Sequence, residues 1–269
     1  MTTLHVLGSG SKGNCFAISS DGATLLVDAG FSAREIERRA ALAGVPLGSV
    51  VGIALTHEHG DHVCGASRLA RRLGVPVLTA PGTWESICAA MEGAAHVALG
   101  CTTAVTLGPF TIHACPTSHD AAEPVALAVH CADGERIGIA YDLGRPTAAV
   151  RYLLRDCTAV VLEANHDELL LRTCGYPPSV QQRIAGSSGH LSNRAAAELL
   201  AEVHHPGLGL VVLAHLSERS NGIAEARGAI EPALRNRGFR GQLHVALQHE
   251  PLPPLALTSP AGAQLGFVF

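Results

Sequence analysis

The chain has 269 residues and a formal net charge of −4, and 47% of its residues are hydrophobic. This length suits one large domain or two small ones and is enough to bury a sizeable core. The slightly acidic balance excludes a molecule-wide basic field that would attract nucleic acid, so any such attraction has to be local.

Cysteine usage and the apolar runs bear on the compartment. Eight cysteines are scattered along the chain without a Cys-x-x-Cys pair, which argues against a cysteine zinc site or a thioredoxin-like motif. The first residues lack a basic stretch followed by an apolar one, and no apolar run is long enough to span a bilayer. We therefore expect a cytoplasmic protein with reduced thiols and no membrane association.

Short apolar runs alternate with amphipathic stretches along the whole chain. Strands are predicted at residues 4–7, 16–19, 24–28, 50–55, 75–78, 110–115, 125–131, 136–141, 159–163, 208–213 and 243–247. Helices are predicted at residues 33–43, 63–73, 81–91, 146–155, 192–204 and 222–237, with shorter helical segments before residue 172 and at residues 179–185. Ser32 with Glu35 predicts a capping box for the first helix, Ser192 caps the fifth, and Ser220 or Asn221 caps the last.

Strand-rich and helix-rich segments occur in both halves of the chain, and no repeat or linker separates them. This distribution is what an α/β sandwich of two similar layers, helix–sheet–sheet–helix, would produce. We expect one domain over residues 1–269, with the Pro-, Gly- and Ala-rich residues from about 250 as a tail. The apolar residues 265–269 are candidates for docking on the surface.

The densest chemical signal is the run Thr-His-Glu-His-Gly-Asp-His at residues 56–62, directly after the predicted strand at residues 50–55. It places three imidazoles and a carboxylate within six positions. Neutral imidazole nitrogen and carboxylate oxygen are ligands of zinc and similar divalent ions. The alternative is a solvated polar loop that is rich in histidine by chance, which leaves the downstream pattern unexplained.

Three further candidate ligands follow predicted strands, namely His119, Asp142 and His215. Because each lies at or just beyond the carboxyl end of its strand, all three can meet the cluster at residues 57–62 at one edge of a sheet sandwich. The sequence thus predicts a metal site assembled from distant segments.

The His-x-His-x-Asp-His order and the strand-end residues together resemble the metallo-β-lactamase superfamily. The resemblance implies an α/β fold of the αββα type, in which two mixed β-sheets are flanked by helices. The resemblance implies a complete set of ligands for two metal ions. One ion would be held by His57, His59 and His119, the other by Asp61, His62 and His215, and Asp142 would bridge the two. Asp28 matches a position that supports the ligand loop by hydrogen bonds, although a turn residue beside Gly30 is an equal alternative.

Two divalent ions in such a site can hold a bridging hydroxide, because metal binding lowers the pKa of water from about 15.7 to about 7. Asp61 is the nearest base, and we expect it to orient this nucleophile and take its proton. An aspartate at position 142, where zinc β-lactamases usually have cysteine, points to phosphoesters, thioesters or lactones as substrates. The ligand types suit zinc or manganese, with iron as a further option.

Other segments resemble the YycJ/WalJ branch of the superfamily, whose members look like bacterial 5′-to-3′ DNA exonucleases. They are Gly-Ser-Gly-Ser-Lys-Gly-Asn at 8–14, Asp-Ala-Gly at 28–30, Ser-His-Asp-Ala at 118–121, Asn-His-Asp at 165–167, the segment 175–184 and Gly-His-Leu-Ser-Asn at 189–193. The resemblance covers roughly residues 4–221.

These segments supply candidates for substrate contact. The loop at residues 8–14 is either an anion-binding nest or a tight hairpin. His190 precedes a helix N-terminus that suits a phosphate, so it would bind a phosphate oxygen or protonate the leaving group, unless it is a surface residue beside an ordinary cap. The candidate substrate-binding residues are Ser9, Ser11, Asn14, Asn165, His166 and Asn193, with turn or capping roles as the alternative.

We therefore predict a metal-dependent phosphodiester hydrolase, a 5′-to-3′ DNA exonuclease that uses Asp61 and His190 in catalysis. The alternative is a small-molecule hydrolase of the same fold that acts on a thioester, a lactone or a cyclic nucleotide. The intact ligand set argues against a non-catalytic interaction protein. The sequence leaves the oligomeric state open.

Overall fold

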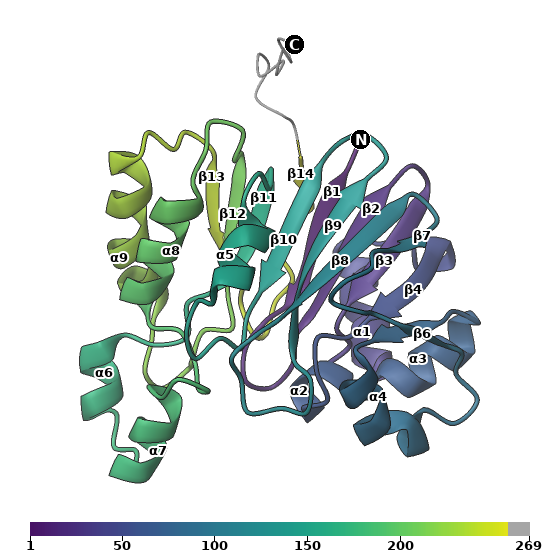
Figure 1. The fold of residues 1–269 in the computed structure, drawn as a ribbon, viewed down its shortest axis with the longest axis horizontal. Coiled ribbons are helices and arrows are strands. Elements are labelled where there is room, and N and C mark those ends of the chain that lie inside the picture. Colours follow the sequence, from purple (N-terminus) through teal and green to yellow (C-terminus); the bar gives the residue numbers. More distant parts are fainter. Residues whose placement is uncertain (258–269) are drawn as a thin grey trace.

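The computed structural model of the chain describes residues 1–257, and the predicted docking of residues 265–269 lies outside this range. Within it, two seven-stranded sheets pack face to face and helices cover both outer faces (Figure 1). The predicted αββα sandwich of two mixed sheets is confirmed.

The first sheet has the strand order β14-β1-β2-β3-β4-β5-β6. Its strands are β1 (Thr3–Gly8), β2 (Cys15–Ser20), β3 (Ala23–Val27), β4 (Val50–Ala54), β5 (Val77–Thr79), β6 (His96–Ala98) and β14 (Leu255–Ala256). The strands from β1 to β3 are antiparallel, and those from β3 to β6 are parallel. The chain beyond residue 250 thus adds a strand to the edge of this sheet, antiparallel to β1, which its composition did not predict.

The second sheet has the order β13-β12-β11-β10-β9-β8-β7. Its strands are β7 (Val105–Leu107), β8 (Phe110–Pro116), β9 (Val125–Cys131), β10 (Arg136–Ala140), β11 (Ala159–Glu163), β12 (Leu210–Ala214) and β13 (Gln242–Val245). It repeats the plan of the first, with antiparallel pairs up to β10 and parallel pairs from β10 to β13. Open sheets with parallel strands place functional residues beyond the carboxyl ends of those strands.

Helices cover the outer faces because their apolar sides have no other core to enter. They are α1 (Ala33–Leu42), α2 (Gly60–Val63), α3 (Ala66–Leu73), α4 (Pro81–Ile87), α5 (Ala148–Leu154), α6 (Glu168–Thr173), α7 (Pro178–Ile184), α8 (Asn193–Val203) and α9 (Ile223–Asn236), with 3-10 turns at Leu47–Ser49 and Cys88–Met91. Apolar side chains of both sheets form the central core, where Phe16 stacks on Tyr141, and α1 and α3 on one side and α5, α8 and α9 on the other close the outer cores. None of the helices in the described range has the length and apolar character needed to cross a bilayer.

One predicted helix and one predicted capping box need correction. The helix predicted over residues 63–73 is divided in the structure, because α2 ends at Val63 and α3 begins at Ala66. Gly65 lies between them, packed so closely that a side chain there would overlap the carbonyl oxygen of Phe31. Ser32 caps α1 by accepting from the Glu35 N–H at 3.3 Å, but the Glu35 carboxylate binds Arg38 and Arg39 instead of completing the capping box.

The last helix, α9, has Gly222 at its N-cap with no side-chain cap hydrogen bond, so neither predicted cap is used. The Ser220 hydroxyl donates to Ser217, and the Asn221 amide exchanges hydrogen bonds with Asn193.

Candidate metal centre

The candidate ligands gather where strands of both sheets end, around the short helix α2 at the lower edge of Figure 1. Asp28 follows β3, Asp142 lies just beyond β10 and His215 follows β12, with φ angles of 56°, 55° and 55°. Non-glycine residues seldom adopt this left-handed backbone, which costs about 1–3 kcal/mol and is concentrated at functional sites. The fold therefore sustains an unfavourable backbone at three strand ends that face one another.

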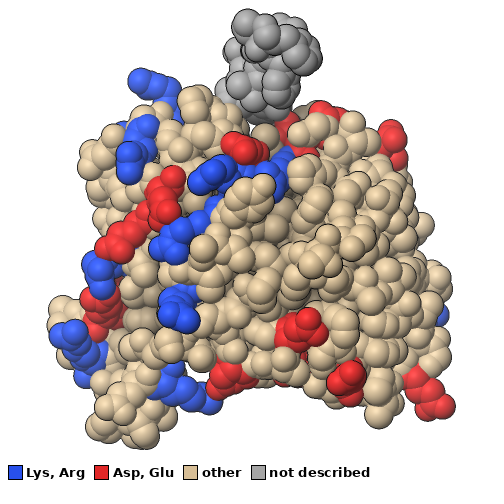
Figure 2. Space-filling model, viewed as in Figure 1, with Lys and Arg blue, Asp and Glu red and all other residues tan. Residues whose placement is uncertain are grey.

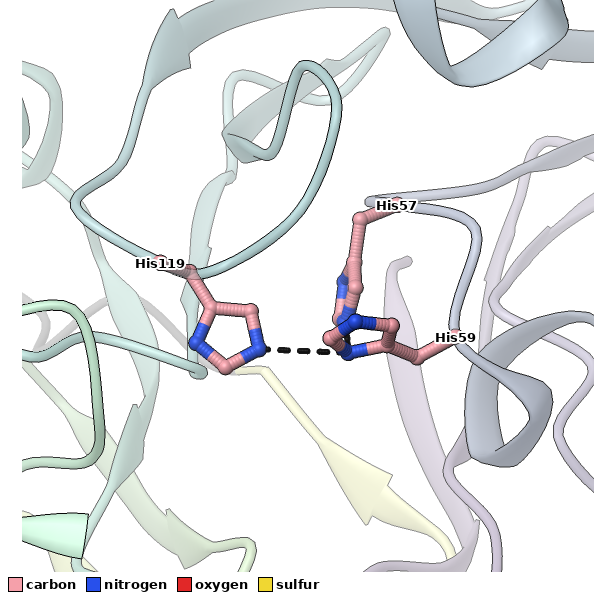
Figure 3. Close-up of side chains that lie close together, drawn as sticks. All are labelled: His57, His59 and His119. Carbon is pink, nitrogen blue, oxygen red and sulfur yellow. Dashed lines mark hydrogen bonds between the residues drawn. The ribbon is translucent and has the colours of Figure 1, made fainter. Parts of the chain in front are cut away.

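Three imidazoles form the first ligand cluster. His59 Nδ1 lies 3.1 Å from His57 Nε2 and 3.3 Å from His119 Nε2, and the three nitrogens are close enough to share one ion. Figure 3 shows the rings converging from two loops, one with His57 and His59 and the other with His119. Burial is the largest cause that lowers the pKa of His57 and of His119, so both rings are neutral and present lone pairs.

The second cluster consists of Asp61, His62 and His215. Asp61 Oδ2 lies 3.4 Å from both His62 Nε2 and His215 Nε2. Burial works against ionisation of Asp61, but hydrogen bonds from His215 and His62 outweigh it and hold the pKa of this carboxyl far below its usual range. The carboxylate and the two ring nitrogens can also share one ion.

Asp142 lies between the two clusters. Its Oδ2 is 3.0 Å from His62 Nε2 and 3.9 Å from His57 Nε2, and its Oδ1 is 3.7 Å from His119 Nε2. The side chain is buried, and its Oδ2, although 3.0 Å from His62 Nε2, has no contact to a described residue with the geometry of a hydrogen bond. A buried carboxylate oxygen without a hydrogen bond is costly unless a cation balances it. The carboxylate thus suits a position shared by two divalent ions.

The ligand rings are held from behind by hydrogen bonds at their other nitrogens. His62 Nδ1 lies 2.7 Å from Asp28 Oδ2, and His215 Nδ1 lies 3.0 Å from Glu163 Oε1. His119 Nδ1 lies 3.2 Å from the carbonyl oxygen of Gly189, and His57 Nδ1 lies 3.0 Å from Thr56 Oγ1. Such partners fix the tautomer and orientation of metal-binding histidines. Donor types, convergence and rear support therefore all fit divalent metal binding.

Asp28 supports this arrangement from beneath the ligand loop. Besides the His62 contact, it accepts hydrogen bonds from the Thr56 N–H at 2.8 Å and from Tyr141 Oη at 2.5 Å. All of these groups are buried, so the carboxylate ties the start of the ligand loop to the end of β10.

Glu163 at the end of β11 is the site residue that sequence reasoning missed. Its buried carboxylate contacts His190 Nδ1 at 2.8 Å and His215 Nδ1 at 3.0 Å, and it accepts from the backbone N–H groups of Leu143 and Leu191. Burial opposes ionisation, but the charge of His190 prevails and lowers the pKa of Glu163 to about 2. An acidic residue that ends an apolar strand was the available signal.

The substitution Glu163→Gln tests this supporting role. The Glu163 carboxylate accepts hydrogen bonds from two histidines and two backbone N–H groups, and a neutral amide has only one oxygen to accept them. We therefore expect metal affinity to fall about 10- to 100-fold. A competition titration against a fluorescent chelator measures it. Glu202→Gln removes an exposed ion pair with Arg151 and is the control. Equal metal affinity of the two variants would contradict the role assigned to Glu163.

Only some of the predicted substrate-binding residues border the cavity that contains the candidate ligands. Ser11 and Asn165 border the cavity that contains the candidate ligands. Ser9 and Asn14 are buried and hydrogen bond to each other at 2.7 Å, and Asn14 Nδ2 lies 3.2 Å from His62 Nε2. These two residues therefore support the ligand loop, and neither of them borders the cavity that contains the candidate ligands.

The other two predicted contacts also need correction. Asn193 is buried and exchanges hydrogen bonds with Asn221 at 2.8 and 2.9 Å, which ties α8 to the start of α9. His166 is buried as well and borders a neighbouring cavity instead of the one with the candidate ligands.

His190 borders the cavity of the candidate ligands with its side chain 23% exposed. Its Nδ1 is engaged by Glu163 and lies 3.2 Å from Asp142 Oδ1. The backbone amides near the start of α8 are less available than predicted, because those of His190, Leu191 and Asn193 donate to Ile184, Glu163 and His166. Phosphate contact at this position would therefore depend on the imidazole of His190.

Gly30 allows the ligand loop to pack closely. A side chain there would overlap the carbonyl oxygen of Asp61, which also accepts a hydrogen bond from the Asn14 N–H at 2.8 Å. We expect Gly30→Ala to destabilise the protein by about 1–3 kcal/mol, the usual cost of overpacking. Urea denaturation measures the change, with Gly48→Ala, which has open space around it, as the control. Equal unfolding midpoints for the two variants would refute the close packing.

A cavity of about 400 Å³ opens over these residues. Its floor is formed by candidate ligands, among them Asp61, Asp142 and His215, and one wall is formed by α7 and the residues before it. The volume lies within the range of about 300–1,000 Å³ that is common for small-ligand sites.

Comparison with known proteins agrees with this geometry. Residues 8–95 match the family model of the metallo-β-lactamase superfamily. The chain is 33% identical over 237 residues to exodeoxyribonuclease YycJ of Bacillus anthracis, and the alignment covers 87% of this chain and 89% of that protein. It is 30% identical over 227 residues to exodeoxyribonuclease WalJ of Streptococcus pneumoniae, which covers 80% and 82%.

Among solved structures, the metallo-β-lactamase fold protein YhfI of Bacillus subtilis superposes with a TM-score of 0.71 at 19% identity, over 93% of this chain and 98% of that one. The chain belongs to the metallo-β-lactamase superfamily and, within it, to the branch of YycJ and WalJ. It is a hydrolase of that superfamily, and its histidine and carboxylate clusters suit divalent metal ions.

Proposed function

We propose that this protein is a 5′-to-3′ DNA exonuclease that hydrolyses phosphodiester bonds with two divalent ions. The observation that carries the proposal is Asp142, a buried carboxylate in contact with both ligand clusters and with an oxygen that no described residue hydrogen bonds. The relatives named as exodeoxyribonucleases align over most of the chain and point to DNA as the substrate.

His57, His59 and His119 would hold one ion, Asp61, His62 and His215 the other, and Asp142 would contact both. Bound there, divalent ions lower the pKa of water to near neutrality and offset the negative charge of a phosphodiester in the transition state. Zinc, manganese and iron all accept these ligands.

The protein's own groups would manage the protons. Asp61 is three-quarters shielded from solvent and ionised, so it can orient the attacking water and accept its proton. Burial lowers the pKa of His190, but the charge of Glu163 and contact with Asp142 outweigh it and raise that pKa to about 10. A protonated imidazole beside the cavity is suited to donate a proton to the departing oxygen.

The charge distribution over the surface is compatible with a nucleic acid despite the net charge of −4. Figure 2 shows basic side chains, interleaved with acidic ones, over the half of this face that α5, α6, α7, α8 and α9 occupy, whereas the other half carries few. Contacts to phosphates supply most of the affinity of proteins for nucleic acid. All eight cysteines are free thiols, in keeping with a cytoplasmic location.

A digestion assay tests the proposed activity. The metal-loaded protein is incubated with DNA labelled at the 5′ or the 3′ end, single- or double-stranded, and in parallel with a thioester and a lactone. Release of labelled nucleotide from the 5′ end is the expected result. Turnover of the thioester or the lactone without shortening of DNA would instead identify a small-molecule hydrolase.

A further inference from the structure

One wall of the cavity over the candidate ligands is apolar and aromatic, in contrast to its floor. It comprises Tyr176 in the loop before α7 together with Val180 and Ile184 on α7. The floor consists of carboxylates and imidazoles, which suit metal ions and phosphate oxygens. A ligand that fills this cavity therefore combines a flat apolar part with an adjacent anionic group.

Tyr176 is held in a fixed position on this wall. Gly175 has a φ of 79°, which lets the chain turn sharply before the tyrosine, and two prolines follow it and begin α7. The Tyr176 carbonyl also accepts a hydrogen bond from Gln181 Nε2 at 2.8 Å. Because the loop is already ordered, binding at the ring costs little conformational entropy.

The ring of Tyr176 has a cation on one side. The guanidinium carbon of Arg219 lies 4.9 Å from the ring centroid, within cation–π distance. Tyr176 also borders the cavity and is only partly buried, so a ligand in the cavity lies next to this residue. An aromatic ring that is backed by arginine and borders a cavity is the arrangement on which unpaired bases stack.

Arg183 supplies a free positive charge on the same wall. It is an exposed residue on α7 that borders the cavity, and its guanidinium forms no hydrogen bond or ion pair within residues 1–257. By contrast, Arg151 and Arg194 on the same half of the molecule are paired with glutamates. Arg183 is therefore available for a phosphate without the loss of an existing ion pair.

We propose that Tyr176 and Arg183 form the nucleotide-binding wall of the active site, where Tyr176 stacks on an unpaired base and Arg183 contacts a neighbouring phosphate. This proposal rests on the proposed function in taking DNA as the bound polymer. A cavity of about 400 Å³ accommodates a nucleotide but not a duplex. The substrate is thus a single strand or the frayed end of a duplex.

A binding experiment separates stacking from general affinity. The metal-loaded protein is titrated, with anisotropy as the readout, against a labelled single-stranded DNA with non-hydrolysable linkages at its 5′ end, and against the same strand lacking the two 5′-terminal bases. We expect Tyr176→Ala to weaken binding of the first strand roughly 5- to 150-fold and to leave binding of the second unchanged, because base–aromatic stacking has this strength. Tyr176→Phe should bind both strands like the wild type.

The matched control is Tyr152→Ala, which removes a 73% exposed tyrosine on α5 and should not alter binding. An equal loss on both strands for Tyr176→Ala would mean a structural role and overturn the stacking proposal. Unchanged binding of the base-containing strand would overturn it as well.

The phosphate contact has a different signature. Arg183→Gln should weaken binding of both strands by the same factor and reduce the slope of log affinity against log salt by about one. An unchanged slope would overturn the role of Arg183.

The outcomes also separate this proposal from the exonuclease activity. Base-dependent binding without any shortening of DNA would retain the nucleotide-binding wall and refute the exonuclease. Shortening of DNA with no dependence of binding on the terminal bases would retain the exonuclease and refute the nucleotide-binding wall.

Discussion

Replacement of Asp61 by alanine is expected to lower the turnover of DNA by about 10²- to 10⁴-fold, the usual contribution of a positioned proton acceptor. Asp61 Oδ2 lies 3.4 Å from His62 Nε2 and from His215 Nε2, so its carboxylate is a candidate ligand and would be the nearest base to an ion bound there. It does not belong to the wall with Tyr176 and Arg183 that would bind the nucleotide. The loss should therefore appear in kcat, with KM changed much less.

Steady-state rates on single-stranded DNA, together with the metal content of each preparation, decide this prediction. Asp61→Asn keeps the shape of the side chain and part of its ligand capacity, and it should retain more metal than Asp61→Ala while it loses the proton acceptor. If Asp61→Asn regained wild-type turnover as its metal content recovered, Asp61 would be a ligand only. Wild-type turnover in Asp61→Ala would remove it from the mechanism altogether.

The second large effect is expected for Asp142→Asn, which should lose both metal binding and hydrolysis. Two divalent ions in adjacent clusters would repel each other, and the Asp142 carboxylate, which contacts both clusters, would offset that repulsion. A neutral amide cannot do so. We expect well below two ions per chain by elemental analysis and a loss of turnover of at least about 100-fold.

The matched control is Asp156→Asn. Asp156 also has a left-handed backbone, with a φ of 61° against 55° for Asp142, but it lies in an exposed turn after α5. Asparagine tolerates this backbone, so neither substitution adds backbone strain, and the two positions differ in their burial and in what the carboxylate contacts. Full metal occupancy in Asp142→Asn would show that the carboxylate does not join the two clusters.

The candidate ligands could be proposed from the chain because histidine and aspartate at fixed spacings after apolar strands are a local pattern. The cluster at residues 57–62, His119, Asp142 and His215 were all found in this way, and the structure brings their side chains together. The αββα fold was predictable because the same residues resemble a family with that fold, and the strand and helix patterns in both halves are compatible with it. Helix caps were less predictable, as α9 shows, because a short polar side chain can hydrogen bond to the helix end or to another segment.

Supporting contacts depended on the tertiary structure, because they join segments that no local pattern links. Glu163 bonds to His190 and His215, which lie 27 and 52 residues away in the chain. Ser9, Asn14 and Asn193 looked like substrate contacts in a glycine-rich loop and at a helix start, yet folding buries them against other segments. Most buried polar groups form hydrogen bonds within the folded protein. Only the folded structure therefore shows which polar groups remain available to a substrate. The pairing of Tyr176 with Arg219 across 43 residues likewise exists only in the folded chain.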